Sequence, residues 1–194
     1  GIKAAFADGA KFLLLCSPQN PMGRVHSQEE LAAIAQLALK HNAIVVSDEI
    51  HAPLTYRDQT FVPYLAVSEA ARKTGVVVTA ASKSFNLAGL KASIFITQDP
   101  EMAALIGAVP PDTHWRSGLL GAFAMAEAFE NCDDWLAKAV ETNQARRDLL
   151  GQLISTQLPG VDYWVPEGGY LAWLDLASLG ISENPALRIL DEQR

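Results

Sequence analysis

The first feature of this sequence that could do chemistry is a lysine between two apolar segments. Lys83 follows the apolar run 75–79 and precedes the run 92–97, with Ser82 beside it and Gly89 shortly after. Lysines seldom stand in such places because removing an ammonium group from water is costly. Small neighbours, hydroxyl donors and a nucleophilic amine are what a covalent cofactor site requires. Taken alone, Lys83 is more simply explained as a turn residue whose side chain reaches water.

Two other apolar runs also end in polar residues. Asn20 follows the run 11–15, and both Asp48 and His51 follow the run 43–47. Helical segments separate the runs, as in βαβ units, so we expect a largely parallel sheet. Ligands of such sheets bind just past the carboxyl ends of the strands. The sequence therefore predicts that these side chains and the lysine segment meet at one edge.

The helices that must position these strands have clear signals. Ser27 begins a helix as its N-cap, with Glu30 completing a capping box, and 41–42 ends it. We expect further helices over 69–73, 100–108 and 115–130, with a break at 110–113. A long helix capped by Asp133 or Asp134 is expected to run to about residue 158. Strands are expected at 161–165 and 170–176, joined by 166–169 as a hairpin or a bulge-linked pair.

Composition narrows the class of protein. The chain has 194 residues, 49% of them hydrophobic, and a formal net charge of −7, which argues against nucleic acid as a partner. No apolar run is long enough to cross a bilayer. Cys16 and Cys132 match no metal or disulfide spacing, which favours a reducing cytoplasm and predicts no metal site. Both ends fall within helical patterns, so we expect an internal piece of a longer protein.

An asparagine, an aspartate and a lysine at one edge suit one cofactor. A carboxylate that faces a pyridine nitrogen keeps it protonated, and a lysine amine forms an imine with an aldehyde, which is the protein's part of pyridoxal 5′-phosphate (PLP) chemistry. Asn20 can donate to the ring's phenolate oxygen, and Ser82 with Lys91 can hold a phosphate. Each residue also has a structural explanation: Asn20 as a turn residue, Asp48 as a cap, His51 as an interior histidine, Lys91 as a surface lysine. The joint pattern favours the cofactor site.

The motifs resemble those of the fold-type I aminotransferases of class I and II. The segments 20–23, 47–51 and 82–91 are similar to N-P-x-G, D-E-x-[YH] and S-K-x-x-x-x-x-G-x-[RK], in family order. The segment 166–173 is similar to P-x-G-x-[YF]-x-x-W. The residues of the second and third motifs, and those of 131–136, are most similar to the cystathionine β-lyase-like (MalY/PatB) branch.

The resemblance implies an α/β fold. It would be a three-layer α/β/α large domain with a mostly parallel sheet, here 1–131, followed by an interdomain helix and part of a smaller α/β domain, 132–194. It implies Lys83 as the residue that binds PLP covalently and moves the substrate's α-proton, and Asp48 as partner of the ring nitrogen. The ring oxygen would face Asn20 and His51, and the phosphate would face Ser82 and Lys91.

Three positions depart from the family pattern. His51 stands where most members have tyrosine, Lys91 where many have arginine, and Ala80 where a hydroxyl is often found. The family's glycine-rich phosphate loop, ring-stacking aromatic and carboxylate-binding arginine have no counterpart in this stretch. We therefore expect the 194-residue chain alone to hold PLP weakly or not at all and to be inactive.

Three functions are compatible with these motifs. The first is a C–S β-lyase that cleaves cysteine S-conjugates to a thiol, pyruvate and ammonia, and the second is an aminotransferase that uses the same residues. The third is a PLP-fold regulatory or interaction module. The resemblance also implies a homodimer acting on a small amino-acid substrate. Within 110–118, His114, Trp115 and Arg116 are expected either near the partner's site or as an exposed helix start.

Overall fold

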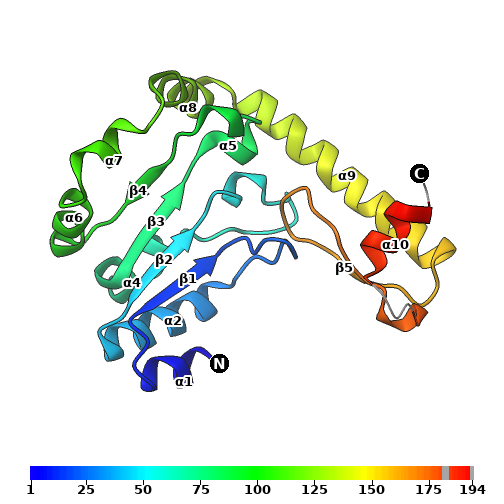
Figure 1. Ribbon diagram of the computed structural model, residues 1–194, viewed down its shortest axis with the longest axis horizontal. Coiled ribbons are helices and arrows are strands. Elements are labelled where there is room, and N and C mark those ends of the chain that lie inside the picture. The colour runs from blue at the N-terminus through cyan, green and yellow to red at the C-terminus, as the bar shows by residue number, and fades with distance from the viewer. Residues whose placement is uncertain (181–183, 193–194) are drawn as a thin grey trace.

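A computed structural model describes residues 1–180 and 184–192, and these residues form a four-stranded sheet, a long helix and a two-stranded sheet (Figure 1). The first part comprises α1 Ile2–Ala7, β1 Phe12–Cys16, α2 Gln28–His41, β2 Ile44–Asp48, η1 Ala52–Leu54, α3 Tyr64–Val67, α4 Glu69–Thr74, β3 Gly75–Thr79, α5 Ala81–Ser84, η2 Ala88–Leu90 and β4 Ile94–Ile96. The second comprises α6 Pro100–Gly107, α7 Pro111–Trp115, α8 Leu119–Asn131, α9 Asp133–Gln157, β5 Asp162–Trp164, β6 Trp173–Asp175, η3 Ala177–Leu179 and α10 Pro185–Glu192.

The large sheet is mainly parallel, as the sequence predicted. Its order is β1-β2-β3-β4, with β1, β2 and β3 parallel and β4 antiparallel to β3. Cys16 at the end of β1 pairs with Asp48 at the end of β2, which in turn pairs with Val78. The three parallel strands therefore end at one level, and the residues that follow them start from a common edge.

One face of the sheet is covered by α2 and its neighbours. Ser27 caps α2 in the predicted capping box with Glu30, and Asn42 ends it with a left-handed φ of 48°. Helical spacing places Leu31, Ala35 and Ala38 on one buried stripe, which packs against side chains of all three parallel strands. The strand residues in this core are Leu15, Val45 and Val77. This packing fixes the level of the strand ends.

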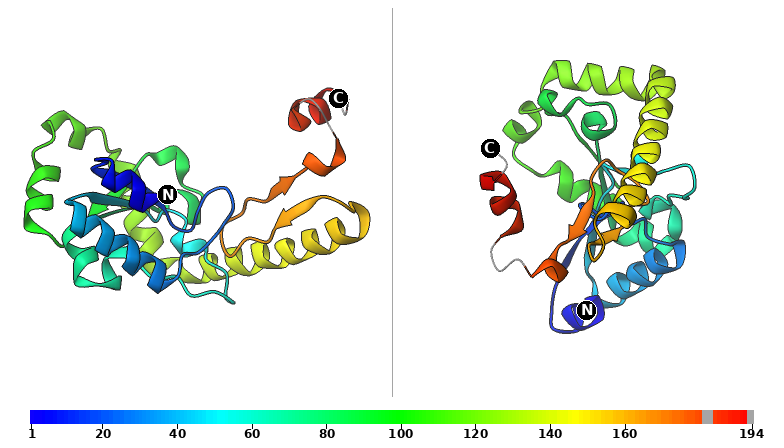
Figure 2. Two further views of the ribbon diagram at one scale, coloured as in Figure 1. Left: turned by 90° about the horizontal axis from the view of Figure 1, so that it is seen from below. Right: turned by 90° about the vertical axis from the view of Figure 1, so that its right-hand side faces the viewer.

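The long helix α9 leads from the large sheet to the β5–β6 sheet, which lies alongside its second half (Figure 2). β5 and β6 pair antiparallel, as expected for a hairpin. The connection between them is long, however, and it reaches back to the large sheet, where Gly168 bridges Thr55. Residues 166–169 thus leave the hairpin and join the edge at which the parallel strands end.

Some predicted bounds were wrong. The segment 110–113 was expected to break the chain, but Pro111 begins α7, because proline is well tolerated at the first helical position. The helix expected from Trp115 starts instead at Leu119. The strand expected over 170–176 is limited to β6. Among the described residues, no helix combines the length and apolarity needed to span a membrane.

Candidate functional site

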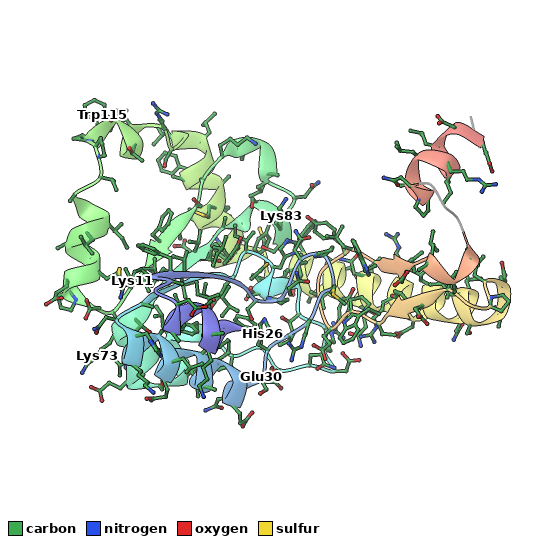
Figure 3. The ribbon with its side chains drawn as sticks, turned by 60° about the horizontal axis from the view of Figure 1, so that its bottom comes forward. Lys11, His26, Glu30, Lys73, Lys83 and Trp115 are labelled. Atoms are coloured by element: carbon green, nitrogen blue, oxygen red, sulfur yellow. The ribbon has the colours of Figure 1, made fainter. Side chains whose placement is uncertain are left out.

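The residues predicted at the strand ends do come together at the carboxyl edge of β1, β2 and β3. Asn20 lies in the loop after β1, Asp48 is the last residue of β2, and Lys83 lies on α5 directly after β3. Figure 3 shows Lys83 at this edge, whereas Lys11 and Lys73 lie toward the other end of the strands. The topology of a parallel sheet alone accounts for this arrangement.

Lys83 is carried by a firmly packed helical turn. Its neighbours Ala81 and Phe85 are buried against Ala128 of α8. The Phe85 ring lies edge-on to Phe129, with centroids 5.6 Å apart, and stacks on Trp135 at 5.8 Å. The sequence predicted an apolar setting, and the backbone of α5 has one. The Lys83 side chain itself is exposed in this chain, because the turn directs its neighbours inward and Lys83 outward.

The loop after Lys83 is held by a close approach of α8. A side chain at Gly121 would collide with the carbonyl oxygen of Leu90, so only glycine allows this contact. Ser82 lines a small cavity together with Leu90 and Gly121. Lys91 follows with a left-handed φ of 54° and an exposed side chain. Ser82 and the backbone beside Lys91 therefore lie on the same side of α5.

Asp48 and His51 differ in their surroundings. The half-buried carboxylate of Asp48 accepts a hydrogen bond from the backbone N–H of Ile50 at 3.1 Å, so it does cap the turn after β2. His51 is only 7% exposed. Burial lowers the pKa of the His51 imidazole, the positive charge of Lys83 lowers it further, and Asp48 opposes this in part. Burial and the charge of Lys83 thus favour the neutral form of the imidazole, and His51 lies within electrostatic reach of both charges.

A second wall of the site comes from the distant segment 166–169. Asn20, Gly23 and His51 line a cavity together with Gly168 and Gly169. Gly23 has a φ of 69°, and a Cβ there would lie 2.5 Å from the Gly168 carbonyl oxygen. Glycine at the end of the N-P-x-G motif therefore allows this wall to approach the loop after β1.

Sequence reasoning missed two contacts of this wall. The Tyr170 ring lies 5.8 Å from the His51 ring, tilted by 47°. The carboxylate of Glu167 accepts the backbone N–H of Val25 at 2.6 Å. The only sequence signal was the similarity of 166–173 to a family motif, which indicates a conserved segment type and not its contacts. Cys16 also lies at this edge, where burial raises the pKa of its thiol and the nearby Asp48 adds to the effect.

Trp115, within the segment 110–118, lies away from Lys83 in this chain (Figure 3). Trp115 is 82% exposed, and Arg116 forms an exposed ion pair with Asp112 at 3.5 Å. The side chain of His114 lies outside the described residues. The prediction that these residues approach a partner's site stays a prediction.

Solved structures of known proteins share this fold. The fold is that of the PLP-dependent fold-type I enzymes: a solved structure from Corynebacterium diphtheriae has a TM-score of 0.92 at 32% identity, covering 98% of this chain and 50% of that chain. The PLP-bound C–S lyase of Staphylococcus hominis has a TM-score of 0.87 at 26% identity, with 98% and 49% covered.

The model of the aminotransferase class I and II family matches residues 1–193, and the chain belongs to this family. It is 36% identical over 193 residues to the cystathionine beta-lyase of Corynebacterium glutamicum, covering 99% of this chain and 51% of that protein. It is 35% identical over 175 residues to the cystathionine beta-lyase PatB of Bacillus subtilis, covering 88% and 44%. The chain thus spans about half the length of the curated relatives it matches.

Proposed function

We propose that the protein carrying this chain is a PLP-dependent C–S β-lyase that acts on cysteine S-conjugates such as cystathionine. The observation that carries the proposal is the meeting of Asn20, Asp48, His51 and Lys83 at one edge of the parallel sheet. Relatives named cystathionine beta-lyase, which are 35% and 36% identical, favour this chemistry within the family.

The residues present fit PLP. A half-buried carboxylate, a buried neutral imidazole and an exposed primary amine form a donor set that complements a pyridine ring nitrogen, a phenolic oxygen and an aldehyde. When bound, PLP supplies an electron sink for the substrate's α-carbon. The three motifs and the fold of PLP-bound relatives agree with this assignment.

Each residue then has a role that follows from its chemistry. Lys83 would hold the cofactor covalently, and its amine, once the substrate's amine has displaced it, would take the proton from the substrate's α-carbon. Asp48 would favour the protonated ring nitrogen through its negative charge. Asn20 and His51 would donate hydrogen bonds to the ring oxygen.

The phosphate would be held by the segment that follows Lys83. Ser82 offers a hydroxyl donor, and Lys91 offers a positive charge. Lysine in place of the family's arginine lacks a fork of N–H groups, so this phosphate contact would be a single point charge.

The lyase and the aminotransferase share these residues and differ in where the proton goes. A lyase expels the thiol from the β-carbon, whereas an aminotransferase returns the proton to the cofactor. One observation favours the second function: the chain is 30% identical over 193 residues to a protein of Bacillus subtilis named "Putative aminotransferase YugH". The full-length protein with cystathionine and no keto acid should release pyruvate and thiol; amino transfer without release would contradict the proposal.

The role of Lys83 has its own test. The full-length protein should show a PLP absorption band, and borohydride should fix the cofactor to Lys83. Lys83→Ala should abolish both this fixation and turnover. Lys73→Ala removes an exposed lysine that pairs with Glu69 at 3.3 Å on the surface of α4, so it should leave both unchanged. Fixation that persists in Lys83→Ala would overturn the assignment.

The remaining predictions form part of this proposal. We divide the chain into 1–131, belonging to a PLP-binding domain, and 132–194, belonging to a smaller domain. Free thiols at Cys16 and Cys132 support a cytoplasmic location.

A homodimer is also part of the proposal. The exposed apolar side chains of Trp115, Leu119, Leu120 and Phe123 on α7 and α8 support it, because such surfaces are commonly covered by a second copy. Sedimentation of the full-length protein should give a dimer, and Phe123→Asp should weaken it.

A further inference from the structure

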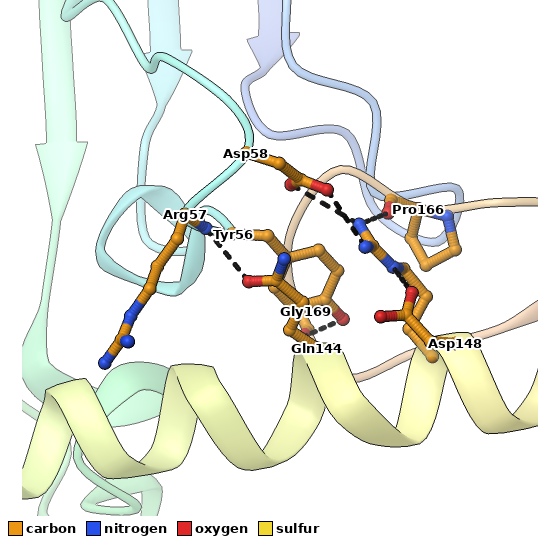
Figure 4. A network of polar contacts seen from close by, with 8 residues as sticks. Tyr56, Arg57, Asp58, Gln144, Asp148, Pro166 and Gly169 are labelled. Atoms are coloured by element: carbon orange, nitrogen blue, oxygen red, sulfur yellow. Dashed lines mark hydrogen bonds and ion pairs between the residues drawn. The ribbon is translucent and has the colours of Figure 1, made fainter.

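A network of polar contacts joins α9 to the loop that contains Asp58 and to the segment 166–169 (Figure 4). The side chain of Arg147 is only 9% exposed. Its guanidinium donates to Asp58 at 3.0 Å, to Asp148 at 2.8 Å and to the carbonyl oxygen of Pro166 at 3.3 Å. It also lies 4.7 Å from the centroid of the Tyr56 ring. These contacts connect α9 to the loop after β2 and to the segment 166–169.

Tyr56 holds the same segment from the other side. Its backbone N–H donates to the carbonyl oxygen of Glu167 at 3.0 Å, and its hydroxyl donates to that of Gly169 at 3.0 Å. The N–H groups of Glu167 and Gly169 donate in turn to the carbonyl oxygens of Gly23 and Leu54, at 2.9 Å and 3.0 Å. Tyr56 is itself 2% exposed, and burial raises the pKa of its hydroxyl to about 12, so it remains a donor.

The segment so held covers His51. A Cβ at Gly169 would lie 3.8 Å from Nδ1 of His51, so the backbone of Gly169 is close to the imidazole. The next residue, Tyr170, places its ring 5.8 Å from the His51 ring. Both contacts lie against His51, which is only 7% exposed.

We propose that Arg147 and Tyr56 are positioning residues that hold the segment 166–169 over His51 and so keep this imidazole dry. Neither residue touches the strand-end groups directly; both act through the backbone of the segment. The inference deepens the proposed function, on which it rests, because His51 is one of the residues assigned to the cofactor ring.

The geometry explains why an arginine occupies this position. The acceptors Asp58, Asp148 and the Pro166 carbonyl oxygen engage different N–H groups of one planar fork. A lysine ammonium is a compact charge that cannot match this arrangement or lie flat on the Tyr56 ring. Arg147→Lys should therefore fail to restore the positioning, although it keeps the charge.

The experiment is an NMR titration of the His51 imidazole in the full-length protein without substrate, assigned with His51→Gln. In the wild type, the pKa of His51 should lie below its ordinary value of about 6.5. Arg147→Met and Tyr56→Phe should each raise this pKa toward that value, because the loosened segment admits water. Arg146→Met, which removes an exposed charge from the adjacent position of α9, should leave it unchanged.

The test must separate the effect of charge on the His51 pKa from the effect of hydration, because Lys83, Asp48 and Tyr170 also face His51. Tyr56→Phe answers this, since it removes one hydrogen bond and no charge. An unchanged His51 pKa in folded Tyr56→Phe overturns the proposal, as does an Arg147→Met shift that only equals that of Arg146→Met. Arg147→Met could fail to fold, and Tyr56→Phe then decides alone.

The titration also keeps the two proposals apart, because it requires no turnover. A protein that releases no pyruvate from cystathionine yet shows the shifted His51 pKa in the variants contradicts the lyase and supports the positioning role. A protein that releases pyruvate from cystathionine but has the same His51 pKa in all variants supports the lyase and contradicts the positioning role.

Discussion

Replacing Gly23 with alanine tests how closely the two walls of the site meet. The φ of Gly23 is 69°, and an added Cβ would lie 2.5 Å from both the Gly168 carbonyl oxygen and the Pro166 Cβ. Ordinary contacts of this kind begin at 3.4 Å, so the segment 166–168 would have to withdraw by about 1 Å in a closely packed region. We expect Gly23→Ala to loosen this wall.

The cost has two parts. A left-handed backbone costs an alanine about 1–2 kcal/mol relative to glycine. Forcing an extra methyl group into a packed contact adds about 1–3 kcal/mol. The sum of about 2–5 kcal/mol is a large share of the about 5–15 kcal/mol by which folded proteins are stable.

Gly180 provides the matched control. Its φ is 64°, close to that of Gly23, but among the described residues no atom beyond its chain neighbours lies within 4 Å of its added Cβ. Gly180→Ala should therefore carry the backbone cost of about 1–2 kcal/mol alone. Denaturant unfolding of the full-length protein, followed by tryptophan fluorescence and circular dichroism, measures both variants.

The difference between the two variants isolates the close approach of the wall. We expect Gly23→Ala to be the less stable by about 1–3 kcal/mol. Equal losses of stability would show that the wall adapts without cost, and the account of the N-P-x-G glycine given above would be wrong.

Three further predictions concern the helix cap, a buried carboxylate and the isolated chain. Ser27→Ala should cost about 1 kcal/mol in denaturant unfolding, because it removes the acceptor for the N–H of Glu30 in the capping box; no loss would contradict this. Burial raises the pKa of Glu49, whose carboxylate accepts the N–H of Tyr64, so its stabilising contribution is complete below the unfolded pKa and is lost as pH rises through the folded pKa. Glu49→Gln should therefore gain stability relative to wild type from acid to neutral pH in unfolding curves, and a constant difference would refute this. The isolated 194-residue chain should give little or no borohydride-fixed PLP at Lys83, and a strong absorption band would contradict that prediction.

The positions of the strand ends could be predicted because the sequence signals that mark them are local. Each parallel strand is a short apolar run followed at once by polar residues, and the capping box of α2 marks where the intervening helix begins. Parallel pairing then requires no further information to place Asn20, Asp48 and the lysine segment at one edge. An interior His51 was one of the two interpretations of the sequence, but its contacts with Gly169 and Tyr170 could not be predicted, because no local pattern connects these residues to it.

The exposure of Lys83 agrees with one of the two interpretations of the sequence, a turn lysine whose side chain reaches water, and not with a buried amine. Apolar flanks indicated burial, but they describe the backbone of α5 and the inward-facing Ala81 and Phe85. A four-residue helical turn separates side chains that are adjacent in sequence onto opposite sides. Flanking hydrophobicity therefore predicts where such a turn is anchored and not where its lysine points.

The wall formed by 166–169 shows what sequence could not supply. Its hydrogen bond from Val25 to Glu167 spans 142 positions, and the Tyr56–Gly169 bond spans 113. Contacts of this length depend on how α9 directs the β5–β6 hairpin back to the sheet, and only the assembled fold determines that. Gly23 of the motif then acquires a physical reason, because an added Cβ would lie 2.5 Å from the Gly168 carbonyl oxygen. Gly168 packs closely on Thr55, whose Cα would lie 3.1 Å from an added Cβ. If Arg147 and Tyr56 hold this meeting point, the distant helix α9 contributes to the site through the segment 166–169, whereas the strand ends contribute their own side chains.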